Sequence, residues 1–463
     1  FIDEEKKSKK VSIAELPVYN KNNITKIIEQ KNIQEILITV TDRSRNNLRK
    51  IINDLKEHQI IARKLPNIRE LASGKAEISD IQRIKIEDLL GRDAVKPDPY
   101  LLRACIENKT ILITGSGGSI GSELARQIIC LNPKKIILIE HSEYFLYKID
   151  YELKDYNIKN KFNIEIKSYL GSVTDKDFIS SIFLKEKINT IYHAAANKHV
   201  PLVEDNPLAA IKTNILGTFT VAEAAYKNNI ENFVLISSDK AVRPTNIMGA
   251  TKRFAELILQ SLQDVVDDLP ANKCNTKFCM VRFGNVLDTS GSVVPLFRKQ
   301  IEEGGPVTVT DPQVIRYFMT ISEATELVIQ ASSLSKGGDV FLLEMGEPIS
   351  ILELAKEMVR LSGNTIKDNN NPLGDIEVIF TGLRSGEKLF EELLIGENVS
   401  KTIHAHIMSA NEEKLSYEKV VEDIDKFKEL TPQSTMKEMQ NILYNSVSGY
   451  TPSISSNVID IKQ

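Results

Sequence analysis

The alternation of short apolar runs with helical segments over residues 109–284 constrains the fold more than any other feature of this sequence. The apolar runs are rich in isoleucine, valine and leucine, and the segments between them are long enough to connect parallel strands. This pattern predicts an α/β fold in which helices cover both faces of a doubly wound parallel sheet. The predicted strands are residues 109–115, 134–140, 163–171, 189–196, 232–238 and 277–284.

A glycine-rich turn follows the first predicted strand directly. Its glycines stand between the strand ILIT and the helical segment SELARQII. Glycines here allow a tight turn, the approach of a pyrophosphate, and close packing of helix on strand, and phosphate is favoured at the N-terminal end of a helix. We therefore expect a Rossmann-type fold with a dinucleotide bound at this turn; a glycine turn without a ligand is the alternative. The expected contacts are Gly115, Ser116, Gly118, Ser119, Ile120 and Gly121.

Glu140 ends the second predicted strand, roughly 25 residues after the first glycine, near the place where dinucleotide-binding folds carry an acidic residue. A carboxylate there accepts hydrogen bonds from a ribose 2′-hydroxyl and repels a 2′-phosphate. The predicted cofactor is therefore NAD rather than NADP.

Two regions flank this predicted core. Residues 24–71 show the pattern helix, strand, helix, strand without phosphate-binding glycines, which favours a scaffold or partner-docking unit. Two prolines in GRDAVKPDPYLL indicate a linker, with a boundary near Pro97. The predicted domains are 1–96, an N-terminal α/β unit and linker; 97–290, a core with the cofactor and catalytic residues; and 291–463, a smaller substrate-binding lobe and C-terminal segment, partly interleaved with the core.

Composition excludes several classes of partner. The 59 basic and 63 acidic residues give a formal net charge of -4, so the chain as a whole has no attraction to nucleic acid or anionic lipid. The 4 cysteines lack metal-site spacing and disulfide density, which predicts free thiols in a reducing compartment and no metal site. No apolar run reaches the roughly 18 residues of a membrane span, so this polypeptide is expected to be soluble.

The tripeptide Ser238-Asp239-Lys240 ends the fifth predicted strand. Adjacent Asp and Lys residues are commonly a solvated surface pair. Open α/β sheets, however, place their chemistry at the carboxyl ends of strands. The position therefore favours a catalytic pair.

The spacing G-x-x-G-x-x-G, the segment HAAA at 193–196 and Asn214 in TNILGT resemble the extended short-chain dehydrogenase/reductase superfamily. The resemblance implies that Ala194 and Ala195 lie against the cofactor and that Lys252 of GATKR holds the nicotinamide ribose. It also implies a tyrosine base one helical turn before this lysine. That position holds Met248, whose thioether cannot act as a base.

The segments AAANKHVPLVE, ISSDKAVRPTNIMGATKR, FGNVLDTSGSVVPLF, GGPVTVTDPQVIRYFMTISEA and GLRSGEKLFEELL are similar to the membrane-anchored bacterial UDP-N-acetylglucosamine 4,6-dehydratases of glycan biosynthesis. The similarity covers residues 97–394. It departs at Ser238, where the family usually has threonine, and at Asp288, where glycine is common. Neither change removes a group that the chemistry needs.

This resemblance implies a mechanism in which C4 is oxidised, water leaves across C5 and C6, and the hydride returns to C6. We expect Asp239 to be the acid for the C6 hydroxyl and Lys240 to be the C5 base, each with a shifted pKa in a dry pocket. With Met248 in the tyrosine position, the acceptor of the C4-hydroxyl proton stays open. One hypothesis is that Asp239 also takes this proton while Ser238 orients the hydroxyl.

The resemblance further implies how the substrate is held. Arg316 and Arg384 are expected to clamp the diphosphate of UDP-N-acetylglucosamine, because a guanidinium is always charged and binds phosphate through paired donors. Further expected substrate contacts are Lys198, Asn285 and Met248, and His199 is either a packing residue or a contact. The family also implies transmembrane helices before Phe1, a location at the cytoplasmic face of the inner membrane, and a homo-oligomer.

Three other functions compete with this prediction. A UDP-hexose 4-epimerase shares the fold and the C4 oxidation, but it depends on the tyrosine that is absent here. A related dehydratase also inverts C5 and differs only in the stereochemistry of its product. A non-catalytic sensor of NAD or nucleotide sugar would explain Met248, but it leaves Asp239 and Lys240 without a role.

Overall fold

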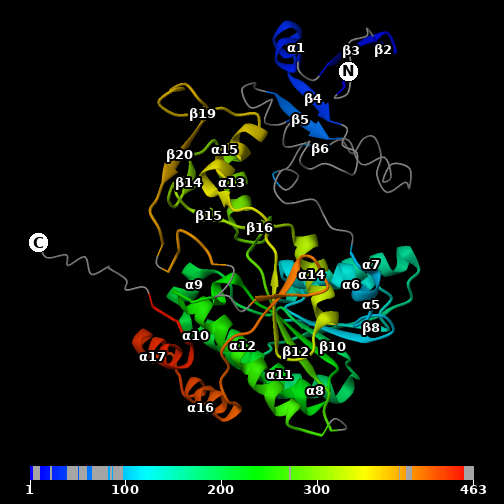
Figure 1. The fold of residues 1–463 in the computed structure, drawn as a ribbon, viewed down its shortest axis with the longest axis vertical. Coiled ribbons are helices and arrows are strands. Elements are labelled where there is room, and N and C mark those ends of the chain that lie inside the picture. Colours follow the sequence, from blue (N-terminus) through cyan, green and yellow to red (C-terminus); the bar gives the residue numbers. More distant parts are fainter. Residues whose placement is uncertain are drawn as a thin grey trace, which may run out of the picture. The chain divides into compact units, whose positions relative to one another are not determined.

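The computed structural model describes residues 1–3, 11–20, 23–38, 51, 60–64, 82–83, 86, 97–270, 273–384, 386–392 and 399–452 (Figure 1). The chain divides into two compact units. The core unit comprises Lys96–Gly291, Val314–Pro348 and Leu383–Gln463, and the second unit comprises Phe1–Val95, Ser292–Gln313 and Ile349–Gly382. Each unit therefore combines segments that are far apart in the sequence.

A nine-stranded sheet forms the centre of the core unit. Its strands are β7 (Thr110–Thr114), β8 (Lys135–Glu140), β9 (Glu165–Leu170), β10 (Thr190–His193), β11 (Asn232–Ile236), β12 (Lys277–Arg282), β17 (Asp339–Leu343), β21 (Val399–Lys401) and β22 (Ile407–Ala410). The order is β21-β22-β17-β12-β11-β10-β7-β8-β9, and the strands from β17 to β9 are all parallel. β22 is antiparallel to β17. The predicted doubly wound Rossmann-type sheet is confirmed, with all its predicted strands.

Helices cover both faces of this sheet (Figure 1). Alternate side chains of a strand point to opposite faces, so Ile111 and Ile113 of β7 belong to one apolar core and Leu112 belongs to the other. The helices on the Ile111 face are α5 (Pro99–Arg103), α6 (Ser119–Ile129), α7 (Glu143–Asn160) and α14 (Ile321–Leu334). The helices on the Leu112 face are α8 (Lys176–Lys185), α11 (Thr218–Lys227), α12 (Ile247–Asp267), α16 (Tyr417–Lys428) and α17 (Met436–Ser446).

The order of the strands reverses at β7. From β7 the chain first runs outward through β8 and β9, and it then returns to the other side of β7 through β10, β11 and β12. In open α/β sheets, ligands bind beside the carboxyl ends of the strands at such a reversal. The loops that follow β7 and β10 therefore flank the expected position of the cofactor.

Helix α12 is buried on nearly all sides, including most of its polar residues. The two C-terminal helices α16 and α17 pack against it. The buried carboxylate of Asp423 in α16 accepts a hydrogen bond from Ser446 of α17 at 2.8 Å, which joins the two helices. The part of the chain after Leu383 therefore belongs to the core unit and completes one of its helical layers.

The second unit contains the N-terminal part of the chain. Helix α1 (Ile24–Lys31) and the parallel strands β4 (Glu35–Ile38) and β5 (Ile61–Lys64) match the predicted helix and strands. The helix predicted at 45–58 lies outside the described residues apart from Ile51, and so does the linker at 91–96. The other elements are β1 (Ile2–Asp3), β2 (Val11–Ile13), β3 (Leu16–Asn20), β6 (Gln82–Arg83), α13 (Val293–Glu302), β14 (Val307–Val309), β18 (Ile349–Ser350), α15 (Ile351–Leu361), β19 (Ile366–Lys367) and β20 (Ile376–Phe380).

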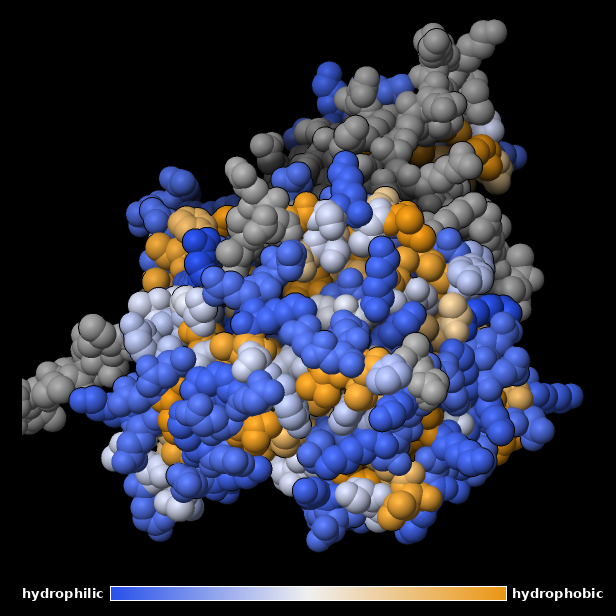
Figure 2. Space-filling view, turned by 60° about the horizontal axis from the view of Figure 1, so that its bottom comes forward, coloured by the Kyte–Doolittle hydropathy of each residue, from blue (hydrophilic) through white to orange (hydrophobic). Residues whose placement is uncertain are grey.

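Hydrophilic and hydrophobic side chains are mixed on the surface. The face that is turned forward in Figure 2 is largely hydrophilic, and its hydrophobic side chains form small separate patches, as is usual for protein surfaces. Among the residues that the structure describes, no helix combines the length and the apolar character needed to cross a bilayer.

Candidate active site

The glycine turn joins β7 to α6, and close packing explains its glycines. Gly115 has a φ of +62°, and a Cβ on it would lie 2.7 Å from the Cα of Ala195. A Cβ on Gly121 would lie 2.1 Å from the carbonyl oxygen of Gly115. The buried hydroxyl of Ser116 donates to the carbonyl of Ile139 at 3.3 Å, so this side chain ties the turn to β8. No larger residue fits at Gly115 or Gly121 without displacing backbone.

Helix α6 begins at this turn. Its N-cap is Gly118, which has no side chain to cap the first amides, and these belong to Ser119 and Ile120. Amides in the first turn of a helix have no partner within the helix, and they add to the positive end of the helix dipole. The turn can therefore receive a phosphate group.

Glu140 ends β8 beside the same turn, and its carboxylate is buried. One of its oxygens accepts a hydrogen bond from the amide of Gly117 at 3.0 Å. The other oxygen accepts from the amides of His141 at 3.0 Å and Ser142 at 3.1 Å. These bonds hold a negative charge next to the glycine turn, where it would repel a 2′-phosphate.

The loop after β10 lies against the glycine turn. Ala194 and Ala195 follow the strand and are both close to Gly115. Lys198 is exposed. His199 packs its ring on the backbone of Gly291, where a Cβ would lie 2.3 Å from its Cε1 atom. Its packing on the backbone favours a structural role for His199.

Lys252 lies one turn after Met248 on α12. Its Nζ donates to the carbonyl of Ile236 at the end of β11, at 2.7 Å, and burial lowers its pKa to about 8. Met248 is 2% exposed and packs in the apolar core on the Leu112 face. The lysine is thus held at the strand end, while the methionine occupies the tyrosine position as a packing residue.

Asn214 ties the loop after β10 to α12. It lies in a π-helical turn, η3 (Ile211–Gly217), and such turns are frequent at functional sites. Its side chain accepts from the amide of Asn197 at 2.8 Å and donates to the carbonyl of the same residue at 3.0 Å. A third bond runs to the hydroxyl of Thr251 at 3.0 Å.

The predicted acid and base lie in a 3₁₀ turn, η4 (Asp239–Ala241), directly after β11. The carboxylate of Asp239 is 3% exposed and accepts hydrogen bonds from the Ser238 hydroxyl at 2.9 Å and from Lys240 Nζ at 3.2 Å. Lys240 Nζ also donates to the side-chain carbonyl of Asn285 at 3.3 Å. A Cβ on Gly249 would lie 2.2 Å from the Lys240 carbonyl oxygen, so the turn rests directly on the start of α12. The structure brings Ser238, Asp239, Lys240 and Asn285 together.

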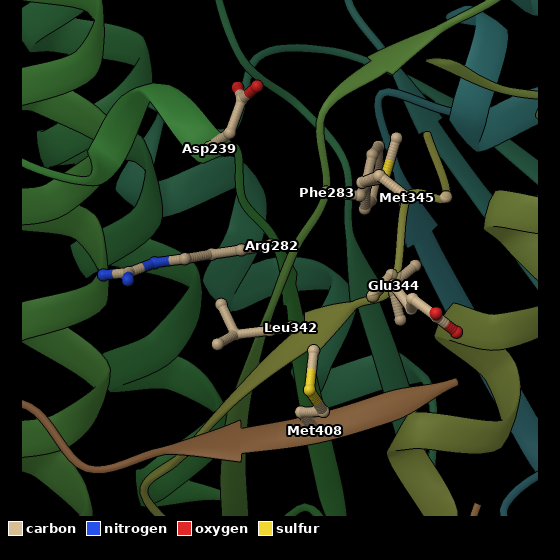
Figure 3. A pocket seen from close by; sticks show the side chains of 9 residues that line it. Asp239, Arg282, Phe283, Leu342, Glu344, Met345 and Met408 are labelled. Carbon is tan, nitrogen blue, oxygen red and sulfur yellow. The ribbon is translucent and has the colours of Figure 1, made fainter. Parts of the chain in front are cut away.

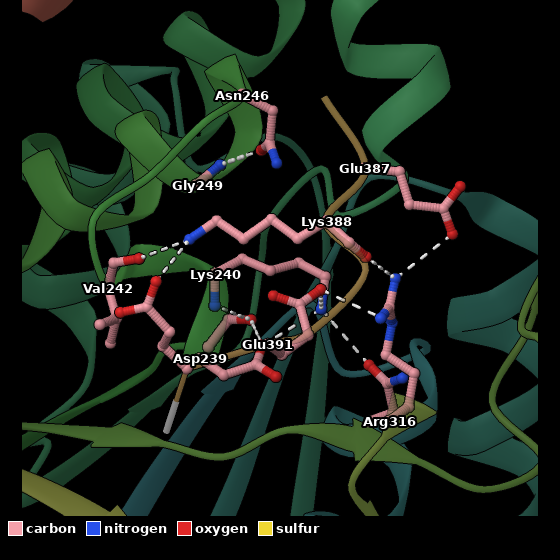
Figure 4. Close-up of polar contacts among 12 residues, drawn as sticks. Asp239, Lys240, Val242, Asn246, Gly249, Arg316, Glu387, Lys388 and Glu391 are labelled. Atoms are coloured by element: carbon pink, nitrogen blue, oxygen red, sulfur yellow. Dashed lines mark hydrogen bonds and ion pairs between the residues drawn. The ribbon is translucent and has the colours of Figure 1, made fainter. Parts of the chain in front are cut away.

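Glu391 is a further member of this cluster that the sequence did not predict. Its Oε1 lies 3.2 Å from Lys240 Nζ and 3.7 Å from Arg316 Nε (Figure 4). Burial raises the pKa of Asp239, opposed by the charge of Lys240. Burial alone would lower the pKa of Lys240, but the carboxylates of Asp239 and Glu391 raise it above its usual value. Burial thus favours the protonated form of Asp239, and the two carboxylates favour the ammonium form of Lys240.

Glu391 reaches the cluster from residues 386–392, which we call the strap. The strap crosses the loop that joins β11 to α12. Lys388 Nζ donates to the carbonyl of Arg243 at 2.9 Å, and Asn246 Nδ2 donates to the carbonyl of Gly386 at 3.0 Å. Arg243 also pairs with Glu392. The strap is therefore anchored at both of its ends.

Arg316 of β15 (Ile315–Arg316) anchors the middle of the strap. Its guanidinium donates to the carbonyls of Lys388 at 2.7 Å and Leu389 at 3.0 Å, and it pairs with Glu387 at 3.3 Å. Arg384, which precedes the strap, is exposed. The two arginines expected to bind diphosphate thus differ: one has its donors occupied by the strap, and the other faces solvent.

A buried ion-pair network links α12 to the neighbouring strands of the sheet, and no sequence pattern predicts it. Arg282 is bound by Glu256 through two bonds of 2.8 and 2.6 Å and also pairs with Glu412. Glu256 further accepts from the Ser237 hydroxyl at 2.6 Å and pairs with Arg253 at 3.1 Å. The arginines hold the pKa of Glu256 at about 2 against the effect of burial. The network joins α12 to β12 and to the end of β11. It lies next to the cluster of Ser238, Asp239, Lys240 and Asn285, which we call the acid–base cluster after its predicted acid and base.

A small cavity of about 80 Å³ lies beside Asp239 at the carboxyl ends of β12 and β17. Asp239 is at one end of it and Met408 at the other (Figure 3). Its lining residues are Asp239, Arg282, Phe283, Leu342, Leu343, Glu344, Met345, Gly346 and Met408. The space is large enough to hold water.

A Rossmann-type sheet with a glycine turn after β7 and a buried polar cluster after β11 is typical of the extended short-chain dehydrogenase/reductase type of fold. Residues 111–412 match the family model described as polysaccharide biosynthesis protein. The chain belongs to this family.

The similar proteins agree with this family. The capsular polysaccharide biosynthesis protein CapD of Staphylococcus aureus is 45% identical over 85% of this chain and 63% of its own length. A UDP-glucose 4-epimerase of Rickettsia massiliae is 32% identical over 64% of this chain and 80% of its own length. The X-ray structure of Pen from Bacillus thuringiensis has 32% identity and a TM-score of 0.57, covering 66% of this chain and 87% of that one. The chain thus spans less than two thirds of its CapD relative.

Proposed function

We propose that this chain carries the catalytic part of an NAD-dependent dehydratase that removes water across C5 and C6 of UDP-N-acetylglucosamine and leaves a 4-keto-6-deoxy sugar. The observation that carries the proposal is the buried cluster of Ser238, Asp239 and Lys240 at the end of β11. Elimination requires an acid and a base close together. An epimerase that only moves a hydride at C4 removes no C5 proton and expels no C6 hydroxyl, so it has no use for Lys240 as a C5 base.

The residues around the glycine turn fit NAD. Gly115 and Gly121 leave no room for side chains, the first amides of α6 have no side-chain cap, and Glu140 places a carboxylate beside the turn. Lys252 of α12, whose Nζ donates to the carbonyl of Ile236 at the end of β11, would hold the nicotinamide ribose. Bound NAD would supply the hydride acceptor for C4 and the hydride donor for C6.

Asp239 serves two proton transfers in the proposed reaction. It takes the proton from the C4 hydroxyl, which Ser238 orients, and it then donates this proton to the departing C6 hydroxyl. Its raised pKa suits both steps, because the carboxyl must hold the proton between them. This assignment needs no base at Met248.

Lys240 removes the C5 proton and returns a proton to C5 when the hydride reaches C6. It must be neutral when it accepts the C5 proton, although its neighbouring carboxylates favour the ammonium. The proposed cycle therefore includes the loss of a proton from Lys240 before elimination.

The diphosphate of the substrate needs cationic partners. Arg384 is exposed, so it can bind phosphate without breaking another contact. Arg316 would first have to release part of the strap. We therefore propose Arg384 as the principal diphosphate ligand, with Arg316 and Lys198 in support and Asn285 shared with the acid–base cluster.

A product assay tests this function. The protein is incubated with NAD and UDP-N-acetylglucosamine, and the product is analysed by mass spectrometry and NMR. We expect the loss of one water and a 4-keto-6-deoxy sugar, and the configuration at C5 separates simple dehydration from dehydration with inversion. Unchanged substrate would support a sensor instead.

The second candidate is a UDP-N-acetylhexosamine 4-epimerase, which the similarity to the Rickettsia epimerase favours. Its product would have the mass of the substrate and the opposite configuration at C4. The same assay therefore separates the two enzymes.

Attachment to a membrane and self-association concern the full-length protein. We propose that the chain works at the cytoplasmic face of the inner membrane and as a homo-oligomer. Light scattering of this chain and fractionation of cells that express the full-length protein test these two points.

A further inference from the structure

Glu391 contacts Lys240 from a segment that is distant in the sequence. Its side chain is 6% exposed, and its Oε1 is 3.2 Å from Lys240 Nζ, the same distance as that from Lys240 Nζ to Asp239 Oδ1. The ammonium thus lies between two carboxylates, with Asn285 as its third polar partner. All three lysine protons can be used in these contacts.

The position of Glu391 is held by the structure around it. The strap is bound on one side of Glu391 by Lys388 and by the donors of Arg316 to its backbone. On the other side, Glu392 pairs with Arg243 and with Lys388. A carboxylate carried on a backbone anchored on both sides needs little ordering when it meets Lys240, so the contact loses little conformational entropy.

The charged groups that face Lys240 come from three elements. Asp239 and Glu391 favour the ammonium, and Arg316 opposes it. The hydroxyl of Ser238 and the amide of Asn285 are neutral. Glu391 itself stays ionised, because Lys240 and Arg316 lower its pKa against the effect of burial.

The two carboxylates around Lys240 are not equivalent during the proposed reaction. Once Asp239 has taken the C4-hydroxyl proton, it is neutral and cannot accept another. Glu391 is then the ionised carboxylate that remains within hydrogen-bond distance of Lys240 Nζ among the described residues. It can therefore keep Nζ in place while Asp239 is neutral.

We propose that Glu391 is a positioning residue for Lys240: its carboxylate holds Nζ between Asp239 and Asn285 and keeps holding it after Asp239 has taken up a proton. The Lys240 side chain is 20% exposed, so before elimination its ammonium can release one proton to water, while Glu391 stays ionised. The lysine is then a neutral amine and can accept the C5 proton. The inference rests on the proposed function only for the role of Lys240 in elimination.

Amine labelling tests the link between Glu391 and Lys240 without any catalysis. The full chain is treated with a small acylating reagent over a range of pH, and the labelling of Lys240 is measured by mass spectrometry. In Glu391→Gln we expect Lys240 to titrate at lower pH, and at a given pH its labelling should be about tenfold faster for every pH unit by which its pKa falls. Glu429→Gln, which changes an exposed carboxylate at the end of α16 that does not contact Lys240, is the control and should label like the wild type.

Kinetics provide the second readout. For Glu391→Gln we expect kcat to fall about 100-fold with little change in KM, and the limb of the pH profile that reports Lys240 to move to lower pH. Glu391→Asp keeps the charge and should recover part of the loss. Circular dichroism and melting temperature identify a variant that fails to fold, in which case Glu391→Asp carries the test.

The outcomes separate the inference from the function. If Lys240 labels alike in wild type and folded Glu391→Gln, the inference is overturned. If its labelling changes but the wild type makes no 4-keto product, the Glu391–Lys240 link stands, and the proposed reaction is wrong.

Discussion

The glycine turn and the acid–base cluster follow β7 and β11, two parallel strands of one sheet with β10 between them, but they are built in different ways. The turn comes from one contiguous segment, from β7 to the start of α6, with Glu140 on the adjacent strand. The cluster combines the end of β11 with Asn285, Arg316 and Glu391, which lie far apart in the chain. Local backbone geometry makes the first site, and tertiary packing makes the second.

Because of this difference, the two sites tolerate different substitutions. At the turn the constraint is steric, and the energetic cost of a substitution follows from the space that its side chain needs. In the cluster the constraint is electrostatic, because the charge of each group sets the protonation of its neighbours. Substitutions that preserve shape but remove charge should therefore spare the turn and disable the cluster.

Asp239→Asn should give the largest effect. It preserves shape and removes the group that carries the proton to the C6 hydroxyl, so we expect turnover to fall by about 10³ or more. Binding of NADH, followed by fluorescence, should stay at the wild-type level. Asp268→Asn, an exposed carboxylate after α12, is the control. Wild-type turnover in Asp239→Asn would refute the role of the cluster.

Gly121→Ala should affect the turn instead. The new Cβ would lie 2.1 Å from the Gly115 carbonyl oxygen, so the backbone must shift. We expect NADH to bind at least about tenfold more weakly, because a displaced turn no longer matches the pyrophosphate. In Gly118→Ala the nearest atom is 3.3 Å away, and the loss should be smaller. Equal affinities in all three proteins would contradict the steric argument.

The substitution Lys252→Met tests whether burial lowers the pKa of Lys252, the lysine next to both sites. Its pKa is about 8 in the folded protein against an ordinary value of 10.5, so between these pH values the unfolded chain binds more protons than the folded one. The free energy of unfolding should therefore rise with pH across this window, by up to about 3 kcal/mol. Lys252→Met should lack this rise in urea titrations at pH 8 and pH 10. An equal rise of the unfolding free energy with pH in the wild type and in Lys252→Met would mean that Lys252 is not desolvated.

Met248→Tyr should give the smallest effect on turnover. If Asp239 accepts the C4-hydroxyl proton, a restored tyrosine is not needed, and turnover should change by less than about tenfold. The larger ring replaces a side chain that is 2% exposed and should lower stability by roughly 1–3 kcal/mol. A large gain in turnover would show that Asp239 is not an adequate acceptor.

The same contrast explains how much the sequence could predict. The strands, the glycine turn and the position of Asp239 and Lys240 follow from local patterns, and the structure has them where the patterns place them. Glu391 could not be found in this way, because Glu387, Glu391 and Glu392 look alike in GEKLFEELL and only the path of the strap separates their partners.

Long-range packing also accounts for the other features that the sequence did not reveal. The pairing of Glu256 with Arg282 joins a helix to a strand, and no spacing in the sequence reports it. The C-terminal helices α16 and α17 have ordinary amphipathic patterns, which show that a face is buried but not that α12 buries it.

Deuterium incorporation at C5, during a reaction with UDP-N-acetylglucosamine in D₂O, is the sharpest test of elimination by the acid–base cluster. We predict one deuterium at C5 of the 4-keto-6-deoxy product made by the wild type. In Lys240→Met we predict accumulation of NADH, seen by its absorbance, with no deuterium at C5, because oxidation at C4 proceeds and proton removal does not. A product from the wild type without deuterium at C5, or deuterium incorporation that persists in Lys240→Met, would contradict the assignment of elimination to this cluster.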